Sequence, residues 1–147
     1  MPLPTVLQNL PLPVIGSPLF IISNPRLVIE QCKAGIVGSM PALNARPASQ
    51  LDEWLAEITE TLAAHNRQHP DRPAAPFAIN QIVHKSNDRL EHDMALCEKY
   101  KVPIIITSLG APHGRERGRA PLGRDRAARH HQQHLCPQGH RQRAPTG

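Results

Sequence analysis

A chain of 147 residues, 39% of them hydrophobic, is long enough for one domain with a sizeable core. Its formal net charge of +5 is uneven: residues 1–112 hold 9 of the 17 Lys and Arg and 10 of the 12 Asp and Glu, whereas residues 113–147 hold 8 and 2, a net +6. Because this basic charge lies in an appendage, the composition argues against a basic nucleic-acid face. The three cysteines, Cys32, Cys97 and Cys136, lack the spacing of a disulfide framework or a zinc site. They therefore argue against a disulfide scaffold and a metal centre, and favour a reducing, cytoplasmic setting.

The first 23 residues are apolar but repeatedly interrupted by proline. No continuous apolar run approaches the roughly 20 residues of a bilayer-spanning helix, and no basic n-region precedes one, so we expect neither a membrane span nor a signal peptide. We predict a buried strand at residues 13–15. Asn24 is then expected to cap a helix that has Pro25 at its first position and runs to Lys33.

The clearest predicted helix follows Ser49, its expected cap, and ends at His69-Pro70. Its apolar residues recur at three- and four-residue intervals, with acidic residues on the opposite side. The apolar set is Leu51, Trp54, Leu55, Ile58, Leu62 and Ala63. We assign this stripe to the core.

Three more short apolar runs, at residues 35–37, 77–83 and 102–107, are bounded by Gly and Pro, as is typical of strands buried on both faces of a parallel sheet. A third helix is expected from about Asn87 to Tyr100. The β-α-β-α-β-α-β order predicts an α/β fold of parallel strands alternating with helices, either a doubly wound sheet or a (β/α) barrel. Periodicity alone does not choose between them. A complete TIM-type (β/α)8 barrel needs about 250 residues, so this chain is expected to supply only its N-terminal half.

The alternating pattern stops after Pro112. Residues 113–147 contain no Ile, Val, Phe or Lys and are expected to form a disordered basic tail. Their His-rich run, which composition alone would allow to bind metal, is not expected to do so; it comprises His130, His131, His134 and His140. When suitable codons for residues 122–142 are read one nucleotide forward, they encode an apolar strand and an amphipathic helix. We therefore hypothesise that the tail is translated out of frame, which sequencing of the gene would test.

The segment PVIGSPLFIISNPRLVIEQCKAGIVGSMPALNARP resembles the opening of the nitronate monooxygenase family, formerly called the 2-nitropropane dioxygenases. In that family the first strand ends in a Pro-Met-type turn beneath the flavin. Pro18, Leu19 and Phe20 correspond to this turn, with Leu19 in place of the usual Met. The segment FAINQIVHKSNDRL matches the strand that carries an Asn to the flavin mononucleotide (FMN), and Asn80 is the matching position.

The segment KYKVPIIITSLGAP resembles the family strand whose C-terminal end faces the active site, which makes Ser108 and Gly110 substrate-side candidates. The resemblance covers roughly residues 11–112 and implies a partial FMN-dependent barrel domain over residues 1–112. In intact relatives, FMN takes electrons from an alkyl nitronate and O2 reoxidises it.

The family's catalytic His and phosphate-binding glycines belong to later strands. No residue of this chain therefore inherits the catalytic role, and we expect FMN binding to be weak or absent. His84 follows the third apolar run and could act as a general base, but we interpret it as a solvent-facing loop residue.

Two alternatives remain open. Flavin-dependent enoyl-reductases share this barrel and a similar opening, and their substrate residues also lie mostly downstream. A small basic nucleic-acid-binding protein is an alternative of another class, although the tail has no aromatic residue to stack on bases. The oligomeric state is not readable, because unpaired strand edges of a half barrel can pair with another copy.

Overall fold

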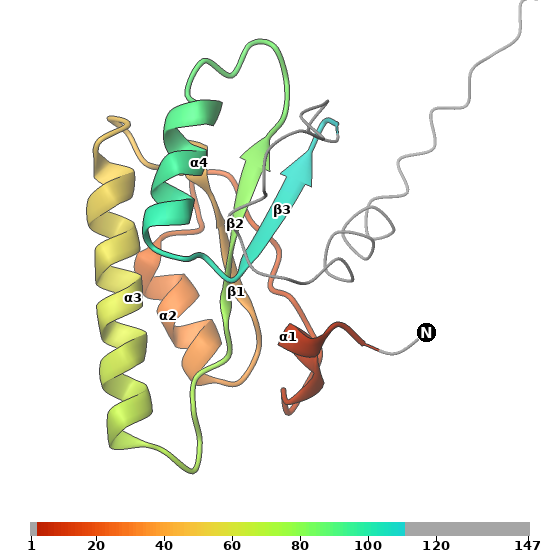
Figure 1. Cartoon of the computed structure of the whole chain (residues 1–147), viewed down its shortest axis with the longest axis vertical. Helices are drawn as coiled ribbons and strands as arrows, with labels where there is room; N and C mark the ends of the chain where they lie inside the picture. The colour runs from red at the N-terminus through yellow and green to blue at the C-terminus, as the bar shows by residue number, and fades with distance from the viewer. Residues whose placement is uncertain (1–2, 111–147) are drawn as a thin grey trace, which may run out of the picture.

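The computed structural model describes residues 3–110 (Figure 1). The hypothesis of an out-of-frame, disordered tail and the His-rich run both fall outside the described residues. The elements, in chain order, are α1 (Thr5–Gln8), α2 (Pro25–Lys33), β1 (Gly38–Pro41), the 3-10 turn η1 (Ala42–Asn44), α3 (Gln50–Gln68), β2 (Phe77–Ile82), α4 (Leu90–Lys99) and β3 (Ile104–Ser108).

The three strands form a parallel sheet in the order β1-β2-β3, with Gly38 opposite Phe77 and Ala78 opposite Ile104. A parallel bridge between Ile15 and Val37 adds the first apolar segment beside β1, at the edge away from β3. Each new strand is thus laid next to the previous one. A doubly wound sheet reverses its direction of growth, whereas a TIM-type barrel adds its strands in sequence. The order is that of a barrel.

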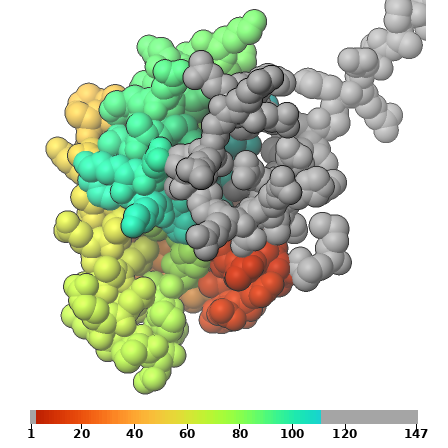
Figure 2. All heavy atoms as spheres, viewed as in Figure 1, coloured from red at the N-terminus to blue at the C-terminus, as the bar shows by residue number. Residues whose placement is uncertain are grey.

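The helices α2, α3 and α4 cover one face of the sheet, and α1 lies on the other side (Figure 1). The space-filling view shows the same separation, with α1 and its flanks (red) away from α3 (yellow) (Figure 2). Successive strand residues point to opposite faces. Met40 and Ile79 join the helices in the larger core cluster, whereas Val37 and Ala78 pack with Leu7 of α1 in a smaller one. We call this second face, which lies away from the three long helices, the inner face.

The helices predicted after Asn24 and after Ser49 both form, as α2 and α3. The Asn24 side chain accepts a hydrogen bond from the backbone N–H of Leu27 at 3.0 Å, and α2 ends at Lys33. Helix α3 ends at Gln68, one residue before His69, and buries most of its predicted apolar stripe, including Leu55 and Ile58. None of the helices within residues 3–110 has the length and apolar character to cross a membrane.

Several predicted boundaries were wrong. The strand at residues 13–15 is reduced to the single bridge at Ile15, because proline removes backbone donors that a ladder needs. The second strand begins at Gly38 rather than Gly35, since Gly35 has a φ of 91° and donates its N–H to the carbonyl of Cys32, which closes α2.

Three further local expectations also need correction. Ser49 makes no side-chain cap hydrogen bond, because it already has helical backbone angles. The third predicted helix starts at Leu90, three residues later than expected. The sequence pattern did not predict the short helix α1, at residues 5–8.

Candidate functional site

The carboxyl ends of parallel strands meet at one end of the sheet, and in (β/α) barrels the functional groups lie in the loops that follow them. Four segments occupy this position: residues 16–23 after the first strand segment, 42–46 after β1, 83–89 after β2, and 108–110, which starts at the last residue of β3. We call them the strand-end loops. They contain all the residues that the sequence singled out as site candidates except Asn80, which lies within β2.

The predicted flavin turn is an exposed apolar segment. Leu19 is 44% and Phe20 57% exposed, and Ile21 and Ile22, which follow them, are more exposed still. Ile21 has a φ of 67°, a left-handed conformation that β-branched residues adopt only rarely and that costs on the order of 1–3 kcal/mol. Such backbone persists only where neighbouring groups hold it in place.

Asn44, at the end of η1, supplies that hold. Its Nδ2 donates to the carbonyls of Leu19 (3.0 Å) and Ser23 (2.8 Å), and its Oδ1 accepts from the N–H of Ile21 at 3.2 Å. The buried hydroxyl oxygen of Ser23 accepts from the N–H of Leu19 at 2.9 Å. The turn therefore has a defined backbone shape even though its side chains face solvent.

Arg46 adds a positive charge beside the turn. Its guanidinium carbon lies 5.3 Å from the centre of the Phe20 ring, within the range of a cation–π contact. Its Nε donates to the carbonyl of Leu43 at 3.3 Å, which holds the side chain against its own loop. An aromatic face and a cation together suit a planar ligand with anionic character.

Asn80 is 5% exposed and lies on the inner face, two residues after Ala78. Its Nδ2 donates to the Ile106 carbonyl at 3.2 Å and to the Ser108 hydroxyl at 2.6 Å. The structure thus brings together two candidates that the sequence had placed on different strands. The contacts tie β2 to β3 and fix the direction of both side chains, while contact between Asn80 and a flavin stays a prediction.

Gly110 is exposed just beyond β3, where a Cβ atom would lie 3.2 Å from the Val83 carbonyl. His84 is exposed in the loop after β2. Its Nδ1 accepts from the backbone N–H of Ser86 at 3.2 Å and lies 2.9 Å from that residue's hydroxyl. This geometry fits the interpretation of His84 as a solvent-facing loop residue.

Sequence reasoning missed Asn44 and Arg46. Both lie in the quoted segment MPALNARP, directly after β1. The available signal was positional, since a polar residue directly after a buried parallel strand lies at the functional end of a barrel. The turn at residues 18–20 and the pair formed by Asn80 and Ser108 are held by separate sets of hydrogen bonds: the first joins the turn to Asn44 and Ser23, and the second joins β2 to β3.

Comparison with known proteins bears on the fold. No protein-family model and no curated protein matches the chain. A solved structure of a mutant FabK from Thermotoga maritima is similar with a TM-score of 0.51 and 20% sequence identity, and the match covers 73% of this chain and 31% of that one. The chain therefore spans about a third of the length of this structural neighbour, with which it shares its α/β fold of parallel strands alternating with helices.

Proposed function

We propose that residues 3–110 form the first strands of an FMN-dependent (β/α)-barrel oxidoreductase, with the strand-end loops facing the flavin. The observation that carries this proposal is the turn at residues 19–22. It is apolar, exposed and partly left-handed, it is fixed by Asn44, and it lies at the end of the sheet where barrels bind ligands. The fold shared with FabK supports the barrel, and the resemblance to nitronate monooxygenases supports the flavin.

The described residues fit such a cofactor. The Leu19 and Phe20 side chains offer an apolar surface for a planar ring, and Arg46 favours electron-rich atoms at the ring edge. Bound FMN would supply the redox chemistry, while the protein orients the ring and limits access of water. Asn80 and Ser108 would present polar groups from the inner face. No residue within 3–110 is assigned as a catalytic acid or base.

For the substrate we propose an alkyl nitronate, with O2 as the electron acceptor, because the quoted segments resemble nitronate monooxygenases. A flavin-dependent enoyl-reductase has the same barrel and remains the alternative. Oxygen uptake that depends on an alkyl nitronate would support the first, and reduction of an enoyl thioester without nitronate-dependent uptake would support the second. Because the match covers 31% of FabK, either activity is proposed for the whole enzyme.

An NMR titration of the full chain with FMN tests where the flavin lies. We expect weak binding, with a Kd of about 1 mM, because a single apolar turn and one cation supply only a few kcal/mol. Amide shifts should concentrate at residues 19–22, 80 and 108. Riboflavin, which lacks the phosphate, should give the same pattern, since the family's phosphate-binding glycines lie elsewhere.

Phe20→Ala should abolish these shifts, whereas Leu12→Ala, at a residue that is 58% exposed outside the strand-end loops, should leave them unchanged. Shifts confined to other parts of the sheet, or none at millimolar FMN, would contradict the proposal. Tight, micromolar binding would instead show that this chain contains its own phosphate-binding site, contrary to the expectation from the sequence.

A further inference from the structure

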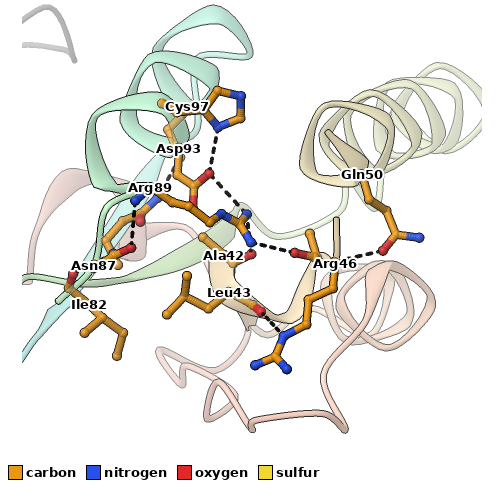
Figure 3. Close-up of polar contacts among 12 residues, drawn as sticks. Ala42, Leu43, Arg46, Gln50, Ile82, Asn87, Arg89, Asp93 and Cys97 are labelled. Carbon is orange, nitrogen blue, oxygen red and sulfur yellow. Dashed lines mark hydrogen bonds and ion pairs between the residues drawn. The ribbon is translucent and has the colours of Figure 1, made fainter. Parts of the chain in front are cut away.

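Arg89, just before α4, contacts the loop that follows β1 (Figure 3). Its Nη1 donates to the Ala45 carbonyl at 2.8 Å, and its Nη2 donates to the Ala42 carbonyl at 3.5 Å. The same Nη2 lies 3.2 Å from Oδ1 of Asp93, which is fully buried one turn into α4. The guanidinium thus bonds three groups drawn from two separate segments.

The two carbonyls that Arg89 binds stand on either side of Asn44 in the chain. Asn44 is the residue whose side chain bonds Leu19, Ile21 and Ser23. Any shift of Ala42 or Ala45 therefore moves the amide that fixes the exposed turn. Lysine could keep the ion pair with Asp93, but a single ammonium lacks the planar fork that reaches two carbonyls at once.

Arg89 is itself held in place by the end of β2. Asn87 donates from Nδ2 to the Ile82 carbonyl at 2.8 Å, and its Oδ1 accepts from the backbone N–H of Arg89 at 3.2 Å. The contacts run in line from β2 through Asn87 and Arg89 to the loop after β1. Asn44 continues them to the loop after the first strand segment. Three consecutive strand-end loops are joined in this way.

We propose that Arg89 is a positioning residue for the turn at residues 19–23. It acts through Ala42, Ala45 and Asn44, and it does not itself touch the ligand. Its identification as part of a flavin site rests on the proposed function, but the mechanical link does not. The left-handed Ile21 gives this link a measurable consequence, because that backbone relaxes when its hydrogen bonds are lost.

Amide hydrogen exchange, measured by NMR on the full chain without flavin, tests the link. In Arg89→Lys we expect exchange at Leu19 and Ile21 to accelerate about tenfold, which corresponds to a local opening made easier by roughly 1.4 kcal/mol. Asn44→Ala, which removes the acceptor of the Ile21 N–H itself, should accelerate exchange at least as much. The double variant should exchange no faster than Asn44→Ala alone, because both changes remove the same contact chain.

The control is Arg67→Lys on the exposed last turn of α3, which should leave every amide unchanged. Acceleration spread equally over β2 and the turn would mean that Arg89 only stabilises the fold, and would overturn the proposal. Additive effects in the double variant, or an unchanged turn in Arg89→Lys, would also overturn it. If wild type shows no FMN-induced shifts, the flavin assignment fails while the exchange result still decides the link.

Discussion

Asn44, at the end of η1, and Asn80, within β2, each use the side-chain amide to bond the backbone of a neighbouring segment. The resemblance to a known family pointed to Asn80, and the structure gives it a partner, Ser108, at 2.6 Å. Asn44 could not be predicted in the same way. Its hydrogen-bond partners lie 21 to 25 residues earlier, and no periodic pattern records such a contact.

Cys32 and Cys97 allow a test at the scale of single groups. Both are fully buried, and burial raises the pKa of each thiol from 9.0 to about 11. Because only the thiolate is nucleophilic, we expect neither to react with a disulfide reagent at pH 8 in the native protein, and both to react in denaturant. The measurement is absorbance of the released thiol, with Cys136 replaced by serine.

The same pKa shifts predict the direction of a pH effect. The unfolded thiols ionise near 9.0, before the folded ones, so ionisation stabilises the unfolded chain first. The free energy of unfolding should be insensitive to these thiols below pH 9 and fall as pH rises toward about 11. In urea unfolding measured at a series of pH values, Cys97→Ser should make the fall of the unfolding free energy with pH less steep. If the fall is as steep as in the wild type, the thiols are not buried and neutral as described.

At the scale of elements, α2, α3 and α4 were predictable because apolar spacing, and for α2 the cap at Asn24, are local signals, whereas the short helix α1 was not. The boundaries of the strands were not. Whether Gly35 ends a helix or begins a strand depends on its positive φ, which the sequence leaves open. The close approach of α2 to β1 at Gly38 is also a tertiary feature, set by where the helix packs.

Gly38→Ala tests that approach. A Cβ at Gly38 would collide with the backbone carbonyl of Val28 in α2, which has no freedom to move aside. We expect a loss of about 1–3 kcal/mol or more in urea unfolding. At Gly16 an added Cβ meets only the end of the flexible Gln31 side chain, so Gly16→Ala should be much milder. Equal effects of the two changes would show that α2 does not pack as described.

For the whole molecule, alternating strands and helices were enough to predict a parallel sheet, yet not which strands are neighbours. Periodicity reports burial along one element, whereas strand order depends on contacts between elements distant in the chain. The sequential order β1-β2-β3, with Ile15 beside Val37, therefore had to come from the structure. The contacts that join the strand-end loops also had to come from the structure, because they too link segments distant in the chain.

The surface of the molecule carries one further prediction. Residues 19–22 form a continuous exposed apolar run, of the kind that marks a binding site. The double change Phe20→Ser and Ile22→Ser should lower the fluorescence of an apolar dye in the native protein without changing the Tm. Leu12→Ser with Val14→Ser, at similarly exposed positions, is the matched control. A larger loss in the control would argue against a binding role for the run.

The contacts that join the strand-end loops run from side chains to main-chain atoms. Asn44, Asn87 and Arg89 bind carbonyl or amide groups, which every substitution at their partners except a change to proline preserves. Positions 19 and 21, whose side chains face solvent, can therefore vary in side chain without loss of these contacts, whereas Ala42 and Ala45 are buried in the core. The exposed side chains of this turn can thus change the surface offered to a ligand, while Asn44, Asn87 and Arg89 keep the loops in position.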